Sequence, residues 1–323
     1  MDVIIVCHTE FGFVSNGEVI YDKAVKSGVE EGVKNLISLA DKYNAKITFA
    51  VCPEVVDYFP KNIKHEIGLH IHPGYARYNY KNFSWIAGDL YLKENCKQSI
   101  NSSVLKDYSY EEQLDMVTKG RNYIIQKLGM DPKVFVAGRW SLNNNTIKVL
   151  IENKIAYDCS AVAHVRSDHY DWSKLPRISM PYHPDASDYQ EKGNLGMLIV
   201  PVSQALLNGI VSPESTIKYG LSWIKACFLE YYKQKSPLFH ICLHSPSMTD
   251  AHLLSAMEKF LSFISKKENI NFKFVSEIKE YPEKTIRGNI LPYFFAGNYN
   301  ILKSGIKKVF KIRNEQYHRQ NNI

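Results

Sequence analysis

Short apolar runs alternate with longer amphipathic stretches over most of the chain. Runs rich in β-branched and aliphatic residues predict strands at residues 3–7, 46–52, 65–72, 134–137, 155–159, 197–200, 239–243 and 272–275. Apolar residues at helical spacing predict helices at residues 24–43, 110–128, 146–153, 215–233 and 251–266. Strands that alternate with helices in this way indicate βα units on a parallel sheet, either a barrel or a doubly wound layer.

Boundary residues sharpen some of these predictions. Ser109 is expected to be the N-cap of the helix that follows it, with Glu112 in the capping-box position. Gly220 is expected to interrupt its helix only weakly. Residues 161–195 show no clear period, so we expect loops there.

Residues 74–107 form a long connection that is rich in aromatic side chains, Tyr75 and Trp85 among them. Loops of this length are usually functional or disordered, and the aromatic content argues against disorder. Aromatic faces stack well on sugar rings, so one interpretation is a cap over a binding site. Ordinary packing is the other.

The composition is that of a globular protein. The chain has 323 residues, of which 45% are hydrophobic and 23% charged. No apolar run approaches the roughly 20 residues that span a bilayer, and Asp2 stands where a secretory leader carries basic residues. Six cysteines form no CxxC pair, so we expect reduced thiols, buried as small hydrophobes, in a cytoplasmic protein.

Positive charge is concentrated at the C-terminal end. The formal net charge is +7, and residues 301–323 carry Lys303, Lys307, Lys308, Lys311, Arg313 and Arg319 against Glu315 alone. We therefore expect one catalytic domain at residues 1–282 and a basic, partly helical extension at 283–323. The extension is expected either to lie solvated on the domain or to contact a membrane surface or an acidic glycan. No nucleic-acid-binding motif accompanies it, so nucleic acid is not an expected partner.

Polar residues collect where predicted strands end. These residues are His8, Glu10, His70, His72, Arg139, Asp158 and His244. The C-terminal ends of parallel barrel strands converge on one face, which is where barrel enzymes place their chemistry. Each residue alone also has an ordinary structural interpretation, as a packed histidine, a surface ion-pair partner or a helix cap.

Glu10, His70 and His72 form a ligand set for a metal ion. His70 and His72 alternate with Ile71, so an extended chain places both imidazoles on one face. Two imidazoles and one carboxylate suit Zn²⁺ or a similar divalent ion with a position left for water. Such an ion can activate water near neutral pH and polarise a carbonyl.

Four segments in this order resemble the motifs of the polysaccharide deacetylase family of carbohydrate esterases. They are Ile5 to Glu10, His65-Glu66-Ile67-Gly68-Leu69-His70, Ala137-Gly138-Arg139-Trp140 followed downstream by Tyr157-Asp158-Cys159-Ser160, and Leu243-His244-Ser245. The resemblance extends to about residue 275 and marks the chain as a divergent member. It implies an α/β fold, a distorted (β/α) barrel of about seven parallel strands.

Carried over to matching positions, the resemblance implies Glu10 and His70 as metal ligands, Arg139 as the residue that orients the catalytic base, and His244 as general acid. The sequence departs from the family in two ways. His8 occupies the position of the catalytic aspartate, and Gly74 occupies that of the second histidine ligand. We expect His8 to act as the base, since imidazole titrates near neutrality, and His72 to replace the missing ligand.

Further site residues complete the prediction. Because His8 replaces the aspartate, Arg139 lacks its usual anionic partner and is expected to meet either Asp158, a further residue of the catalytic group, or a carboxylate of the substrate. Tyr75, Trp85 and Trp140 are the expected substrate-binding residues. The predicted cofactor is one divalent metal ion, zinc being the expected one.

The predicted function is a metal-dependent hydrolase that removes an N-acyl group, expected to be acetyl, from an amino sugar in surface-glycan biosynthesis. The alternative is a non-catalytic glycan-binding or scaffolding protein on a degenerate site. A phosphoesterase would need more metal ligands than the sequence offers. A serine nucleophile at Ser245 lacks the GxSxG elbow.

Overall fold

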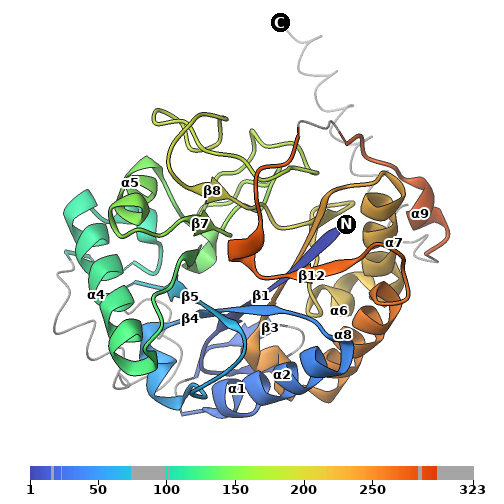
Figure 1. Cartoon of the computed structure of the whole chain (residues 1–323), viewed down its shortest axis with the longest axis horizontal. Coiled ribbons are helices and arrows are strands. Elements are labelled where there is room, and N and C mark those ends of the chain that lie inside the picture. The colour runs from blue at the N-terminus through green and yellow to red at the C-terminus, as the bar shows by residue number, and fades with distance from the viewer. Residues whose placement is uncertain (16–17, 23, 74–98, 101, 283–285, 297–323) are drawn as a thin grey trace, which may run out of the picture.

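Parallel strands form a curved sheet at the centre of the protein (Figure 1). The computed structural model describes residues 1–15, 18–22, 24–73, 99–100, 102–282 and 286–296. The strand order is β11-β1-β4-β5-β6-β7-β8, and every neighbouring pair is parallel. These strands are β1 (Asp2–Thr9), β4 (Ile47–Val51), β5 (Glu66–Ile71), β6 (Val134–Ala137), β7 (Tyr157–Asp158), β8 (Leu198–Ile199) and β11 (Leu238–His244). A further strand, β12 (Asn271–Lys273), pairs in parallel with β1.

The sheet closes only partly, which makes the barrel distorted. The two end strands of the described path are β8 and β11, and the segment after β8 hydrogen-bonds to β11. In it, Ser203 N–H donates to the His240 carbonyl at 3.2 Å, and Cys242 N–H donates to the Val211 carbonyl at 3.0 Å. The expected distorted (β/α) barrel of about seven parallel strands is confirmed, and a doubly wound layer is excluded.

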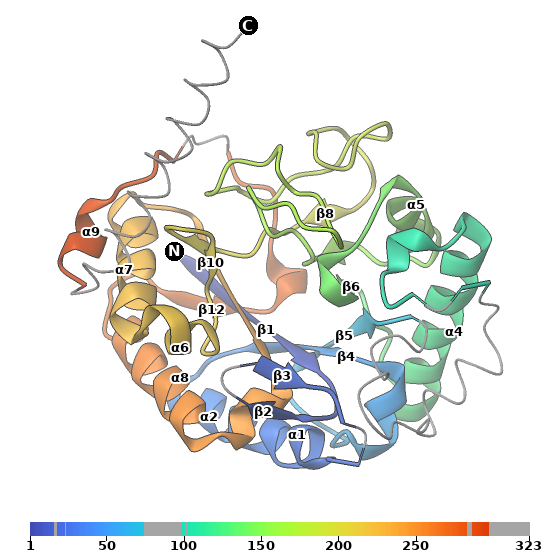
Figure 2. The same cartoon turned by 180° about the vertical axis from the view of Figure 1, so that it is seen from behind.

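Helices cover the outside of the sheet, as Figures 1 and 2 show from opposite sides. The longer ones are α2 (Gly32–Tyr43), α4 (Tyr110–Leu128), α5 (Asn144–Glu152), α7 (Leu221–Lys233) and α8 (Ala251–Ile264). Short ones are α1 (Ser27–Glu30), α6 (Ser215–Tyr219) and α9 (Leu291–Phe294), with 3-10 turns η1 (Pro53–Tyr58), η3 (Leu105–Asp107), η4 (Gly138–Trp140), η5 (Ser245–Thr249) and η6 (Val275–Glu277). Ser109 forms the expected capping box with Glu112 at the start of α4.

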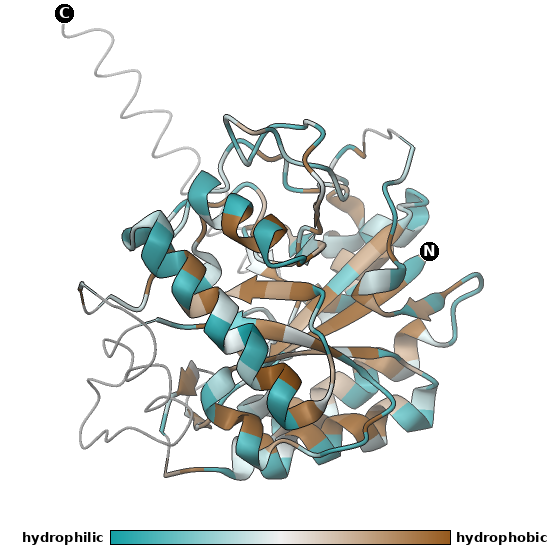
Figure 3. Ribbon diagram, turned by 60° about the vertical axis from the view of Figure 1, so that its left-hand side comes forward, coloured by the Kyte–Doolittle hydropathy of each residue, from teal (hydrophilic) through white to brown (hydrophobic). Residues whose placement is uncertain are grey.

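Strand alternation separates two buried apolar clusters. Along β1, Val3, Ile5 and Cys7 pack in the large cluster that includes residues of the outer helices. Ile4 and Val6 pack in a smaller cluster with residues of the facing strands, so this cluster fills the inside of the barrel. The strands are apolar along their length (Figure 3), as expected when both faces are buried. His8 continues the inward-facing positions of β1 beyond Val6.

Two predicted helices are each divided. The stretch 24–43 forms α1 and α2, which Glu31 separates. Gly32, the first residue of α2, approaches η5 so closely that a Cβ atom there would lie 2.1 Å from the Ser245 carbonyl oxygen. The prediction that Gly220 interrupts its helix only weakly is wrong. Gly220 has φ +79° and ψ 153°, outside the helical region, and so it ends α6 and begins α7.

Two hairpins were not predicted. They are β2 (Phe13–Ser15) with β3 (Glu18–Ile20), and β9 (Gln204–Ala205) with β10 (Gly209–Ile210). The dipeptide Asn16-Gly17 between two apolar runs was the available signal for the first hairpin.

The described start of the predicted C-terminal extension packs on the barrel. Tyr293 of α9 is fully buried, and its hydroxyl donates to Glu230 Oε2 of α7 at 2.7 Å. Glu230 also accepts the Asn289 N–H at 2.6 Å and both guanidinium Nη groups of Arg177, with Nη1 at 3.0 Å from Oε2. The domain boundary at 282 stays a prediction, and the basic residues from 301 onward lie outside the described residues. Within the described part of the chain, no helix has the length and apolar character needed to cross a bilayer.

We predict that Glu230→Ala lowers the free energy of unfolding by about 3–5 kcal/mol, because it leaves the Arg177 guanidinium buried without its carboxylate. Urea unfolding measures the change. The control is Glu258→Ala, which removes an ion pair to Lys42 whose side chains are 41% and 59% exposed, and should cost about 0–1 kcal/mol. Equal effects of the two substitutions would contradict the prediction.

Candidate active site

The C-terminal ends of β1, β5, β6 and β11 border one cavity of about 410 Å³. The cavity is lined by His8, Val19, Ile20, Tyr21, His70, His72, Ala137, Arg139, Trp140, His169, Tyr170 and His244. Six of the residues predicted from strand ends or as substrate contacts are therefore here: His8, His70, His72, Arg139, Trp140 and His244. The parallel sheet brings them together, since all follow or end strands at the same edge.

The Glu10 carboxylate lies directly behind this cavity, with none of its surface exposed. Its Oε1 atom is 3.0 Å from His70 Nε2 and 3.1 Å from His72 Nε2. Burial would raise the pKa of Glu10, but the contacts with the two imidazoles outweigh it and hold the pKa well below its usual value. Glu10 is therefore a carboxylate, as a metal ligand must be.

His70 has its ring orientation set by the neighbouring strand. Its Nδ1 lies 2.8 Å from the Val136 carbonyl oxygen, an acceptor, so Nδ1 carries a proton. In the neutral ring, Nε2 then presents a lone pair to Glu10 Oε1. Two lone pairs at 3.0 Å repel unless a proton or a cation lies between them. A hydrogen bond from the second ring nitrogen to a backbone carbonyl is typical of histidines that bind metal.

His72 lies beyond the end of β5, with its ring centroid 5.0 Å from that of His70. A methyl group at Gly138 would lie 2.4 Å from His72 Nδ1, so the imidazole fits only because residue 138 has no side chain. Burial lowers the pKa of His72 despite the contact with Glu10. The ring is thus neutral near pH 7, as ligation requires.

His8 is in the middle of a group of rings. Its ring centroid is 4.8 Å from those of His70, Trp140 and His244. Burial, followed by the nearby His244 and His70, lowers the pKa of His8 well below its usual value. His8 Nε2 is buried and has no hydrogen-bond partner among the described residues. This nitrogen is placed to accept a proton.

The pKa of His244 is shifted in the opposite direction from that of His8, because the Glu214 carboxylate lies beside His244. Glu214 Oε1 is 3.3 Å from His244 Nδ1 and accepts the His244 backbone N–H at 2.9 Å. Burial would lower the pKa of His244, but the contact with Glu214 raises it above its usual value. Neighbouring groups whose pKa values are pushed apart are the arrangement expected for a base and an acid.

Arg139 and Trp140 form the rim on the β6 side, in an unusual backbone conformation. Their φ angles are +54° and +58°, in the left-handed region that non-glycine residues seldom adopt. Arg139 Nε donates to Ser103 Oγ at 3.0 Å, and its Nη1 lies 3.2 Å from His169 Nε2. Strained backbone of this kind is concentrated at functional sites.

Asp158 takes a different position from the one expected. It is fully buried at the end of β7, where Ser160 Oγ donates to Oδ1 at 2.6 Å and Ser160 N–H donates to Oδ2 at 3.0 Å. Burial raises the pKa of Asp158 to about 7. It is not among the described residues that line the cavity, and the structure does not pair it with Arg139. Tyr75 and Trp85 lie outside the described residues.

Sequence reasoning missed five residues that contribute to the site: Glu214, Cys52, Tyr21, His169 and Tyr170. Glu214 follows no predicted strand, and Cys52 was interpreted as a small buried hydrophobe. Tyr21 directly follows β3, and its ring centroid is 5.6 Å from that of His72. Cys52 directly follows β4, which was the available signal, because strand ends supply the other site residues.

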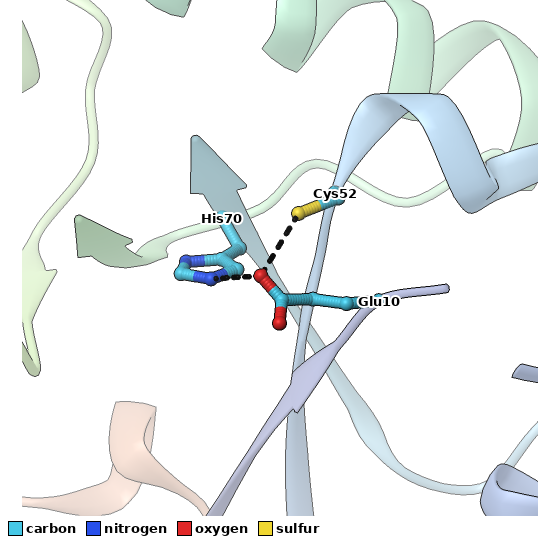
Figure 4. A group of neighbouring side chains, drawn as sticks. All are labelled: Glu10, Cys52 and His70. Atoms are coloured by element: carbon cyan, nitrogen blue, oxygen red, sulfur yellow. Dashed lines mark hydrogen bonds and ion pairs between the residues drawn. The ribbon is translucent and has the colours of Figure 1, made fainter. Parts of the chain in front are cut away.

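The donor set fits a divalent metal ion. Glu10, Cys52 and His70 each offer one ligand atom, and these atoms lie within 4.8 Å of one another. Figure 4 shows the Cys52 sulfur and the His70 ring directed at the same carboxylate oxygen. His72 Nε2 also lies 3.1 Å from that oxygen. Imidazole, carboxylate and thiolate groups are ligands of zinc and similar ions.

No family model matches the sequence, and no curated protein sequence matches it. Solved structures do match. A Mycobacterium smegmatis protein assigned as a polysaccharide deacetylase aligns over 88% of this chain and 94% of its own, with 18% identity and a TM-score of 0.54. The chain has the polysaccharide deacetylase fold. The expected family resemblance is thus confirmed at the level of the fold.

Two further structures share this fold with the chain. The Puue allantoinase and a protein from Pseudomonas aeruginosa PAO1 assigned as a polysaccharide deacetylase each align over 85% of this chain and 88% of their own, with 15% identity and a TM-score of 0.54. Because one fold carries different activities, the reaction has to be argued from the site residues.

We predict that Glu214→Gln lowers the pKa of His244, because it removes the negative charge that favours the imidazolium. His244 then loses its proton at a lower pH than in the unmodified protein. Titration of the histidine signals by NMR measures the change, with Glu258→Gln on the surface as control. An unchanged His244 titration would contradict the assigned role of Glu214.

We predict that Gly138→Ala weakens divalent-metal binding by about 10–100-fold, the size typical of changes to groups that orient metal ligands. The added methyl group must displace the His72 ring. Competition with a metallochromic chelator measures the affinity. Gly196→Ala is the matched control, since a side chain there meets nothing within 4 Å. Equal affinity in both variants would show that the His72 position does not matter.

Proposed function

We propose that this chain is a metal-dependent hydrolase of the polysaccharide deacetylase family, which removes an N-acyl group, acetyl in the first instance, from an amino sugar. The observation that carries the proposal is the convergence of His70 and His72 on one buried Glu10 oxygen, at 3.0 and 3.1 Å, beside a cavity that also contains His8 and His244. Metal-assisted hydrolysis of an amide needs a set of metal ligands close to a general base and a general acid.

Glu10, His70 and His72 would hold the ion, which we propose is zinc. A divalent ion there supplies Lewis acidity, which polarises the acyl carbonyl and makes water more acidic. The hydrogen bond from Nδ1 to the Val136 carbonyl orients the His70 ring. The absence of a side chain at Gly138 leaves room for the His72 ring.

His8 and His244 would move the protons. His8 Nε2, buried without a described hydrogen-bond partner, accepts a proton from the attacking water. The water oxygen bonds to the acyl carbon, and the carbon–nitrogen bond then breaks. His244, whose pKa Glu214 raises against the effect of burial, donates a proton to the leaving nitrogen. The products are a carboxylic acid and a free amine.

Aromatic and cationic groups at the rim suit a sugar substrate. Trp140, Tyr21 and Tyr170 line the cavity, and Arg139 provides guanidinium hydrogen-bond donors. The volume of about 410 Å³ lies in the usual range for small-molecule sites. Tyr75 and Trp85 remain proposed substrate contacts, and Asp158 a proposed member of the catalytic group. Ser160 donates to both oxygens of Asp158, so Asp158 would contribute as a positioning residue at the end of β7 and would not contact the substrate.

The biological setting is also part of the proposal. We place the reaction in surface-glycan biosynthesis in the cytoplasm, with the basic residues after 301 available for contact with a membrane surface. The alternative is a non-catalytic glycan-binding protein. The replacement of the catalytic aspartate by His8 and the thiol beside Glu10 favour it, because both depart from the pattern of the family.

We predict that the purified chain releases acetate from at least one member of a panel of N-acetylated sugars, and that His8→Ala and His244→Ala each reduce the rate by about 10²–10⁴-fold. Both variants should retain the ion, which elemental analysis measures. His252→Ala replaces an exposed histidine of α8 and should leave the rate unchanged.

Two results would overturn the catalytic proposal. One is full activity in both histidine variants. The other is sugar binding with a retained ion but no release of acetate or formate from any member of the panel, which would identify the non-catalytic alternative.

A further inference from the structure

The thiol of Cys52 lies at the metal-binding group although the family resemblance gives it no role. Cys52 directly follows β4 and has none of its surface exposed. Its Sγ is 3.9 Å from Glu10 Oε1, the oxygen that His70 Nε2 approaches to 3.0 Å. In Figure 4 the sulfur and the imidazole reach this oxygen from different strands.

We propose that Cys52 is a ligand of the metal ion, so that the ion is held by a thiolate as well as by Glu10 and the histidines. This inference rests on the metal site of the proposed function, but not on deacetylase activity.

The distances between donor atoms support coordination. Ligands of a tetrahedral zinc ion, at bond lengths of about 2.0 Å to nitrogen or oxygen and 2.3 Å to sulfur, are separated by roughly 3.3 Å for N···O and 3.5 Å for S···O. The observed separations from Glu10 Oε1 are 3.0 Å to His70 Nε2 and 3.9 Å to Cys52 Sγ. Each of these two separations lies within about half an ångström of the tetrahedral value, and the ligand atoms of Glu10, Cys52 and His70 all lie within 4.8 Å of one another.

A second observation points to a ligand at this group. His8 is 3% exposed, its ring is 4.8 Å from that of His70, and its Nε2 has no hydrogen-bond partner among the described residues. A buried imidazole nitrogen near Glu10 and His70 is thus available to a ligand bound at this group. Cys227, by contrast, is buried in α7, far from this group in sequence and structure.

The proposal predicts which ions bind. A set of imidazole, carboxylate and thiolate favours Zn²⁺ or Co²⁺ over Mg²⁺, Ca²⁺ or Mn²⁺, which prefer oxygen ligands. Binding forms a metal–sulfur bond, and the thiol proton is released to solvent, so no oxidant is consumed. Glu10, His70, His72 and Cys52 would together supply four ligands, and a position for water would require one of them to be displaced.

The test replaces the native ion with Co²⁺ in the full-length chain and records the near-ultraviolet spectrum. A thiolate ligand produces an intense sulfur-to-cobalt charge-transfer band. We expect this band in the unmodified chain and in Cys227→Ala, and its loss in Cys52→Ala and Cys52→Ser. Circular dichroism verifies folding, and the unmodified chain decides the matter if both Cys52 variants fail to fold.

The outcomes separate this inference from the proposed function. One equivalent of bound Co²⁺ without the band, or an unchanged band in Cys52→Ala, overturns the thiolate ligand and leaves the hydrolase intact. A band together with no acyl release from any sugar supports the ligand and overturns the hydrolase. Failure to bind Co²⁺ or Zn²⁺ overturns both.

Discussion

The buried carboxylate of Glu10 is the constraint on which the site depends. A carboxylate without solvent is costly unless positive charge or hydrogen-bond donors surround it. Here Oε1 lies 3.0 Å from His70 Nε2 and 3.1 Å from His72 Nε2. Because His70 donates its Nδ1–H to the Val136 carbonyl, its Nε2 can offer Glu10 only a lone pair or a second proton. A divalent cation resolves the conflict, since it accepts both lone pairs at once.

Much of this arrangement could be read from strand periodicity. In β1 the buried apolar residues alternate between two clusters, and His8 follows the inward-facing positions. In β5, Ile67, Leu69 and Ile71 all pack in the large outer cluster, so the alternating position His70 faces the other way, where it lines the cavity. Parallel strands then place these ends at one edge. The alternation of strands and helices, the capping box at Ser109 and the polar residues at strand ends were therefore predictable from local patterns. The choice of a barrel over a doubly wound layer, and the roles of Arg139 and His244, came from the resemblance to the deacetylase family.

Part of what escaped prediction depends on tertiary contacts between remote segments. Glu214 contacts His244 from the residue before α6, and neither hydrophobic periodicity nor a predicted strand end distinguishes it. Asp158 is a local case: Ser160, two residues further on, donates to both its oxygens, which corresponds to the capping role that the sequence left open. Gly220 shows the same limit for backbone. A glycine within a helical pattern either continues the helix or ends it, and the packing of the flanking turns decides.

Cys52 connects the two departures of this chain from the deacetylase pattern. In the family pattern the acidic base and the acidic ligand at the end of the first strand together bring two negative charges to a divalent ion. This chain has His8 in place of one of them, and burial keeps that ring neutral. Glu10 alone would leave a bound M²⁺ with uncompensated charge in a buried site, which is unfavourable. A thiolate at Cys52, 3.9 Å from Glu10, restores the second negative charge from a neighbouring strand. The negative charge that is lost at residue 8, where an imidazole replaces a carboxylate, is then supplied by the thiolate at residue 52.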